Sequence, residues 1–200
     1  MKTYLALGDS YTIGEQVLLT ETFAYQMVNL LRNKNIEITA PEIIAKTGWT
    51  TDELNHAISQ QAFLKSYDFV SLLIGVNNQY RGQNVEVFKI EFEVLLKQAI
   101  LFAGNKTTNV FVLSIPNWGQ TPFAKDRDIA KIEIEIDEYN VACEKITLQH
   151  NCIFIDITTA KKGNADNAEM FASDGLHPSG KEYAKWAELL SKKINDFHFS

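Results

Sequence analysis

Short apolar runs alternate with segments of helical period along this chain, and this alternation restricts the fold more than any other feature. The sequence predicts strands at 3–7, 36–45, 69–74, 109–115 and 152–157. It predicts helices, from apolar residues at helical spacing, at 23–33, 52–60, 85–102, 129–150 and 179–197. Such alternation predicts a parallel sheet with helices on both faces, and the near-continuous apolar strands are typical of burial on both sides.

Length and composition fit this interpretation. The 200 residues suit a single domain spanning 1–200, with 46% hydrophobic and 22% charged residues as in ordinary globular proteins. A formal net charge of -6 argues against a nucleic acid or an anionic membrane surface as partner. Two cysteines, Cys143 and Cys152, are too few for a disulfide framework or a metal knuckle.

Neither a membrane span nor a signal peptide is predicted. No apolar run approaches the roughly 20 residues that a spanning helix needs. The first residues lack a charged segment followed by an apolar stretch. We therefore expect a cytoplasmic protein, with export after removal of a signal peptide as the alternative. We expect the polar stretch 158–167 to be a loop that does not divide domains.

Unusual polar residues cluster just past the predicted strand ends. They lie in the segments 8–10, 46–50, 75–78, 116–118 and 174–178. In a parallel sheet all strands end at the same rim, which is where such folds bind ligands. The sequence therefore predicts a site that these five segments share.

The first of these segments allows three interpretations: a phosphate loop, a plain turn or the position of a nucleophilic serine. Gly8 and Gly14 are six residues apart, which excludes a G-x-G-x-x-G loop, and no P-loop lysine follows. Thr12 excludes the G-x-S-x-G elbow. We expect Gly8 to end the first strand and let the chain turn, so that Ser10 stands at the rim.

A nucleophilic serine needs a base within hydrogen-bond reach, usually a histidine oriented by a carboxylate. Three of the four histidines lie in predicted helices or in the C-terminal tail: His56, His150 and His198. Only His177 lies on the predicted rim, three residues after Asp174. A simple turn before the last helix would also explain the Asp, Gly and Pro of this segment.

An oxyanion formed during acyl transfer needs donors fixed in advance, and a glycine N–H and an asparagine amide are common choices. Gly48 and Asn77 occupy suitable rim positions. Each also has a purely structural interpretation, Gly48 as a turn residue and Asn77 as a cap at a strand end.

Taken together, four segments resemble the four sequence blocks of the SGNH/GDSL hydrolases in order and spacing. They are Gly8-Asp9-Ser10, Gly48, Gly75-Val76-Asn77 and Asp174-Gly175-Leu176-His177. The resemblance implies a three-layer α/β/α fold with a five-stranded parallel sheet of flavodoxin-like order. It also implies an ester or thioester hydrolase that works through an acyl-enzyme, without a metal or cofactor.

The resemblance assigns a role to each matching residue. It implies that Ser10 is the nucleophile, that His177 is the general base and then acid, and that Asp174 orients His177. The backbone N–H groups of Ser10 and Gly48 and the side-chain amide of Asn77 would form the oxyanion hole.

The chain departs from the family pattern at one position. The third block is often G-x-N-D, whereas Asn78 here replaces the acidic residue. This difference concerns the support of the loop rather than the mechanism. We assign Asp9 to bracing the loop, because it adjoins the nucleophile and cannot easily reach around to it.

The substrate is predicted only as a small-molecule ester. Five aromatic residues adjoin the rim segments and could line the site or pack beneath its loops: Tyr11, Trp49, Tyr80, Trp118 and Phe171. The loops after the strands are short and form no long apolar lid, which favours short-acyl or polar esters. Arg81 could meet an anionic substrate group or serve only at the surface. Alternatives are a carbohydrate O-deacetylase, a lysophospholipase or acyl-thioesterase, and a catalytically silent binding module.

Overall fold

Five parallel strands form one sheet in the computed structural model, which describes residues 1–158 and 168–198. The strands are β1 (Tyr4–Asp9), β2 (Glu42–Lys46), β3 (Phe69–Leu73), β4 (Val110–Leu113) and β5 (Ile153–Ile155). Their order across the sheet is β2-β1-β3-β4-β5, and every neighbouring pair is parallel. The predicted five-stranded parallel sheet of flavodoxin-like order is thereby confirmed.

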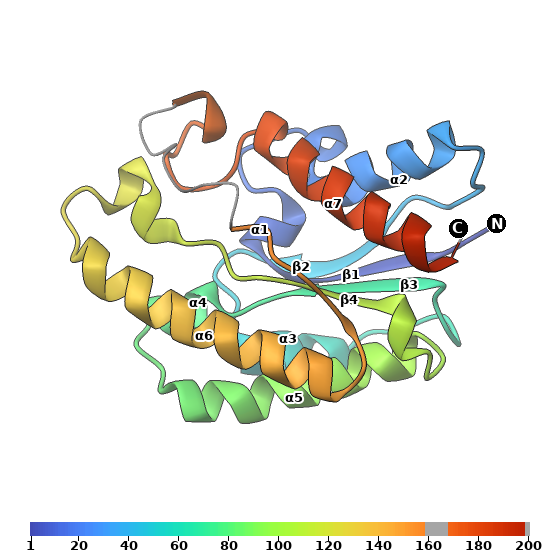
Figure 1. Cartoon of the computed structure of the whole chain (residues 1–200), viewed down its shortest axis with the longest axis horizontal. Helices are drawn as coiled ribbons and strands as arrows, with labels where there is room; N and C mark the ends of the chain where they lie inside the picture. Colours follow the sequence, from blue (N-terminus) through green and yellow to red (C-terminus); the bar gives the residue numbers. More distant parts are fainter. Residues whose placement is uncertain (159–167, 199–200) are drawn as a thin grey trace.

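Helices cover both faces of the sheet and complete a three-layer α/β/α fold (Figure 1). The longer helices are α2 (Phe23–Asn33), α3 (Thr51–Ser59), α5 (Val85–Phe102), α6 (Ile129–Gln149) and α7 (Gly180–His198). Helices α2 and α7 pack together on one face, while α3, α5 and α6 lie on the other. Short helical segments are α1 (Ser10–Ile13), α4 (Val76–Tyr80), η1 (Leu19–Glu21), η2 (Thr107–Asn109), η3 (Trp118–Gln120), η4 (Pro122–Ala124) and η6 (Ala168–Met170).

The central strands hold the hydrophobic core. Every residue of β1, β3 and β4 is buried, because helices cover these strands from both sides. The edge strand β2 is only half-buried. Burying one large apolar side chain contributes about 1.5–3 kcal/mol, so this sandwich provides the main favourable term in folding.

The strand order places a crevice at one point of the rim. From β1 the chain connects to β2, toward one edge of the sheet. From β3 it connects to β4, toward the opposite edge. Ligands of open α/β sheets bind where the connections diverge in this way, outside the carboxyl ends of the strands. Here α1 follows β1 directly and α4 follows β3 after two residues, so both short helices begin at that crevice.

The predicted strands and longer helices all exist, with ends shifted by a few residues in most cases. The expectation that Gly8 ends the first strand is wrong, since β1 continues through Asp9. A glycine is needed at this position instead because the Leu73 backbone and the Thr12 side chain approach it closely. A Cβ there would lie 2.3 Å from the Leu73 carbonyl oxygen and 2.1 Å from Thr12 Oγ1.

Three other expectations concern the chain as a whole. Residues 159–167, nearly all of the polar stretch 158–167, lie outside the described residues. Within 1–158 and 168–198, no helix combines the length and apolar character needed to cross a membrane. Cys143 and Cys152 are both buried free thiols.

Candidate active site

Ser10 stands at the junction of β1 and α1. Asp9 caps this four-residue helix, because its Oδ1 accepts a hydrogen bond from the Tyr11 backbone N–H at 3.0 Å. Ser10 is therefore the first helical residue, and its side chain leaves the end of the strand at the rim. The residue is only 4% exposed.

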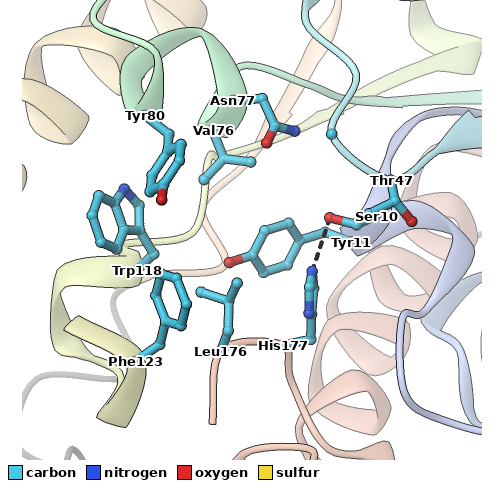
Figure 2. A pocket seen from close by; sticks show the side chains of 11 residues that line it. Ser10, Tyr11, Thr47, Val76, Asn77, Tyr80, Trp118, Phe123, Leu176 and His177 are labelled. Carbon is cyan, nitrogen blue, oxygen red and sulfur yellow. Dashed lines mark hydrogen bonds between the residues drawn. The ribbon is translucent and has the colours of Figure 1, made fainter. Parts of the chain in front are cut away.

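His177 meets Ser10 from the other end of the sequence. Its Nε2 lies 2.8 Å from Ser10 Oγ, and its Nδ1 lies 2.6 Å from Asp174 Oδ2. Figure 2 shows the Ser10 and His177 side chains pointing toward each other at one end of the pocket. A hydroxyl, an imidazole and a carboxylate are thus in contact in this order. When the hydroxyl oxygen attacks an acyl carbon, its proton can pass to the imidazole.

A tight turn fixes Asp174 under the imidazole. Its Oδ1 accepts the backbone N–H groups of Leu176 and His177, at 2.9 and 3.0 Å. Partial burial alone would raise the pKa of this carboxyl, but hydrogen bonds from the His177 side chain and from these two N–H groups bring the pKa below its ordinary value. Asp174 thus stays ionised and can accept a hydrogen bond from His177 Nδ1.

The segment 47–49 lies beside Ser10 and is tethered to α4. Gly48 has a φ of 82°, a left-handed conformation that favours glycine. The Asn77 side-chain amide donates to the Trp49 carbonyl oxygen at 3.0 Å. The Arg81 guanidinium donates to the Gly48 carbonyl oxygen at 2.5 Å and pairs with Glu53 at 3.3 Å. Arg81 therefore has a structural contact in this loop, close to the site.

Asn77 and Gly48 both line the pocket that contains Ser10 and His177. An amide nitrogen carries two hydrogens, so the bond to Trp49 leaves Asn77 a second donor. A carbonyl oxygen between Ser10 and these two residues could accept from them as negative charge develops.

Asn78 replaces the acidic residue of the family pattern without leaving its polar groups unsatisfied. Its buried side chain accepts the Thr51 backbone N–H at 3.2 Å. Its amide donates to Thr51 Oγ1 at 2.7 Å and to Gln83 Oε1 at 2.6 Å. The amide therefore links α4 to the start of α3, and the Gln83 oxygen needs the donor that an ionised carboxylate would lack.

Asp9 and Tyr11, the two neighbours of Ser10 in the sequence, are buried beside the site. The Asp9 side chain is fully buried, and its Oδ2 has no hydrogen-bond partner among residues 1–158 and 168–198. Burial raises the pKa of this carboxyl to about 7, although the Tyr11 N–H bond opposes the shift. The Tyr11 ring lies 4.9 Å from the His177 ring and 6.4 Å from that of Trp186, so it packs between the site and α7.

The pocket in front of Ser10 has a volume of about 210 Å³. Its polar lining residues are Ser10, Thr47, Gly48, Asn77 and His177. Its apolar and aromatic lining residues are Tyr11, Val76, Tyr80, Trp118, Phe123 and Leu176 (Figure 2). The polar groups gather at the serine, and the rest of the cavity is largely apolar.

Three of the aromatic residues singled out from the sequence line this pocket: Tyr11, Tyr80 and Trp118. Trp49 and Phe171 are not among the described residues that line it. The Trp49 side chain packs against the hydrophobic core, while Phe171 pairs with Pro178 in an isolated bridge.

Sequence reasoning missed four lining residues: Thr47, Val76, Phe123 and Leu176. Three of them lie inside the rim segments 46–50, 75–78 and 174–178, so their proximity to the motif residues was the available signal. Phe123 lies outside these segments, and the Phe123 N–H donates to the Gly175 carbonyl oxygen at 3.0 Å. This contact between distant segments brings η4 to the site.

The other histidines lie elsewhere. His56 is on the exposed side of α3, His150 contacts Glu93 at 3.0 Å, and His198 contacts the Thr108 carbonyl oxygen at 3.2 Å. Across the part of the chain that the structure describes, no three His, Cys, Asp or Glu side chains are grouped so that they could hold a metal ion.

The model of the GDSL-like Lipase/Acylhydrolase family matches residues 6–185. This chain belongs to that family. Membership makes it an ester hydrolase, and the resemblance seen in the four sequence blocks is confirmed. The match spans the segments that carry Ser10, Gly48, Asn77 and His177.

Solved structures share the fold of this GDSL-like hydrolase at low sequence identity. A lipase/acylhydrolase from Enterococcus faecalis is 20% identical, with a TM-score of 0.77 over 98% of this chain and 96% of that one. Axe2, an acetylxylan esterase from Geobacillus stearothermophilus, is 17% identical, with a TM-score of 0.76 over 96% and 94%. The esterase EstA from Pseudoalteromonas sp. is 16% identical, with a TM-score of 0.69 over 98% of both chains. No curated protein matches the sequence.

Proposed function

We propose that this GDSL-like hydrolase cleaves carboxylic esters with short acyl groups through an acyl-enzyme on Ser10. The observation that carries the proposal is the continuous line of contacts from Ser10 Oγ through His177 to Asp174, at 2.8 and 2.6 Å. It opens onto a pocket that Gly48 and Asn77, the two further candidate oxyanion donors, also line.

In the first half-reaction, Ser10 Oγ attacks the acyl carbon while its proton passes to His177 Nε2. The Asp174 carboxylate at Nδ1 stabilises the resulting imidazolium. The carbonyl oxygen becomes an oxyanion, held by the N–H groups of Ser10 and Gly48 and the amide of Asn77. The tetrahedral intermediate then expels the alkoxide, which takes the proton from His177 and leaves as an alcohol.

The second half-reaction releases the acid. Water attacks the acyl carbon of the ester on Ser10, and its proton passes to His177 Nε2. The same three donors hold the second oxyanion. When it collapses, the bond to Ser10 Oγ breaks, Oγ recovers the proton from His177, and the carboxylic acid leaves.

The apolar and small pocket supports short acyl groups over long ones. A cavity of about 210 Å³ lies below the roughly 300–1,000 Å³ of typical small-molecule pockets. Carbohydrate O-deacetylation is the second candidate. Tyr80 supports it, because this residue is 48% exposed and its ring meets that of Trp118 at 5.2 Å, where a sugar ring could stack. Axe2, which shares the fold, is an acetylxylan esterase.

A substrate panel tests the proposal. It contains p-nitrophenyl esters from acetyl to dodecanoyl, acetylated sugars, a lysophospholipid and an acyl thioester, each assayed with the wild type and with Ser10→Ala. We expect hydrolysis of the short p-nitrophenyl esters that disappears in Ser10→Ala. Activity confined to acetylated sugars would favour the deacetylase, and preference for the lysophospholipid or thioester would reject the short-ester assignment. Hydrolysis that survives in Ser10→Ala would reject the nucleophile.

A further inference from the structure

Trp118, the first residue of η3, forms a wall of the pocket opposite Ser10 and is held by several contacts. It is only 5% exposed, and its ring meets Tyr80 at 5.2 Å and Phe123 at 6.1 Å in edge contacts. The Thr121 hydroxyl donates to its carbonyl oxygen at 2.6 Å. Both the backbone and the ring of this residue are therefore held in place.

A buried side chain of α4 holds the indole nitrogen. Trp118 Nε1–H donates to Gln79 Oε1 at 2.7 Å, and the amide of Gln79 donates to Glu135 Oε2 on α6 at 2.7 Å. Gln79 is 6% exposed. Removing Gln79 would leave a buried indole N–H without an acceptor, which costs free energy. The hydrogen bond to Gln79 therefore fixes the Trp118 side chain in one orientation.

The geometry of a tetrahedral carbon indicates which part of the substrate reaches Trp118. Its bond to Ser10 Oγ takes one direction, and the oxyanion faces Gly48 and Asn77. The leaving oxygen must lie near His177 Nε2, which protonates it. The fourth direction, that of the acyl substituent, then points into the apolar part of the cavity, where Figure 2 shows the Trp118 ring.

We propose that Trp118, held by Gln79, forms the end wall of an acyl pocket and sets the longest acyl chain that the enzyme accepts. Gln79 acts as a positioning residue through Trp118. This inference rests on the proposed function, because it takes Ser10 as the position of the acyl carbon. It adds a specificity determinant that lies on α4 and η3, outside the residues of the four sequence blocks that carry the chemistry.

The wall should show in the dependence of kcat/KM on acyl length. Each methylene that fits the apolar pocket raises kcat/KM about fourfold, and one that meets the wall does not. With p-nitrophenyl esters from acetyl to decanoyl, we expect the wild type to peak near hexanoyl. Trp118→Ala should raise the ratio of decanoyl to butanoyl kcat/KM at least tenfold.

Gln79→Leu should shift the same ratio in the same direction by severalfold, because an unpaired Trp118 loses its fixed position. In a Trp118→Phe background, Gln79→Leu should have no further effect, since the phenyl ring has no N–H to hold. Gln98→Leu is the matched control, as Gln98 donates to Asn55 between α5 and α3, away from the pocket. Unchanged ratios in both Trp118→Ala and Gln79→Leu would overturn the inference.

Acetate esters of methanol to hexanol separate the acyl side from the alcohol side. Trp118→Ala should leave the dependence on alcohol length unchanged. A shift in this series without a shift in the acyl series would place Trp118 on the alcohol side and overturn the inference.

A binding measurement keeps this inference separate from the proposed function. The indole N–H resonance of Trp118 is assigned by its loss in Trp118→Phe, and it should move on addition of hexanoate but not of acetate. A resonance that hexanoate leaves in place would contradict the acyl pocket. Ester hydrolysis that persists in Ser10→Ala would instead reject the nucleophile, whatever the response of the Trp118 resonance to hexanoate.

Discussion

At the residue scale, the Asn77 amide donates to the Trp49 carbonyl oxygen, and we propose that its second hydrogen points toward the acyl oxygen of the substrate. Asn77→Ala should lower kcat by 10²–10³, or about 3–4 kcal/mol, as expected for one lost oxyanion donor. KM should change less than threefold, because the interaction strengthens only as charge develops. Steady-state kinetics on p-nitrophenyl butanoate provide the measurement, and a kcat near that of the wild type would remove Asn77 from the oxyanion hole.

Asp9 is the residue whose titration should affect stability most clearly. Its carboxyl pKa is about 7 in the folded protein against an ordinary value of 3.8, because burial disfavours the charged form. The folded state therefore binds more protons than the unfolded state between these two pH values. The contribution of Asp9 to stability is fully favourable below about pH 4 and is lost as the pH rises through about 7.

Asp9→Asn should remove this loss, because the amide is neutral and its oxygen can still accept the Tyr11 N–H. Urea unfolding at pH 5 and pH 8 should give a free energy of unfolding that declines less with pH in Asp9→Asn than in the wild type. An equal decline in the two proteins would show that the Asp9 carboxyl is not the group responsible.

At the scale of elements, the segment 47–49 depends on its tether to α4. Arg81→Gln should lower kcat about tenfold by loosening Gly48, while the free energy of unfolding changes by less than about 1 kcal/mol, as is usual for an exposed ion pair. Arg32→Gln is the matched control, because Arg32 also donates to a backbone carbonyl oxygen, that of Ile38, far from the pocket. Equal kcat values in Arg81→Gln and the wild type would show that the loop keeps its geometry without the tether.

The sequence allowed the strands and longer helices to be predicted because their apolar periodicity extends over enough residues to be recognised. Helix α5 was predicted at the observed limits, 85–102. The short helices α1 and α4 were not predicted, since four or five residues cannot show a helical period. Each of these helices turns the chain at the end of a strand. Asp9 is the N-cap residue of α1, and Gly75 is that of α4.

The candidate site was predictable where chemistry limits the residue type, and less so where packing decides. Ser10, His177 and Asp174 stood out because they lie at the predicted rim, carry the groups that acyl transfer needs, and match the family blocks that assign their roles. Trp49 and Trp118 looked alike in the sequence, but Trp49 follows the left-handed Gly48 and packs against the core. Gln79 carried no sequence signal, because its role depends on α6 lying behind it.

At the scale of the whole molecule, the two ends of the chain meet in one structure. Strand β1 lies inside the sheet between β2 and β3, and α7 packs with α2 on one face of that sheet (Figure 1). We propose that residues 1–200 fold as one domain, because neither end of the chain can detach without exposing apolar residues that are buried between the two ends. Urea unfolding should then give the same midpoint by tryptophan fluorescence and by far-UV circular dichroism. Two separate midpoints would indicate independently folding parts.

The same arrangement brings Ser10 from one end of the chain to His177 from the other, and we propose that hydrolysis passes through a covalent intermediate on that serine. The most direct measurement is the intact mass of the enzyme after reaction with a fluorophosphonate, followed by peptide mapping. We predict one adduct on Ser10, with concurrent loss of esterase activity and no adduct in Ser10→Ala. An adduct on another residue, or an unmodified and still inhibited enzyme, would show that Ser10 is not the nucleophile.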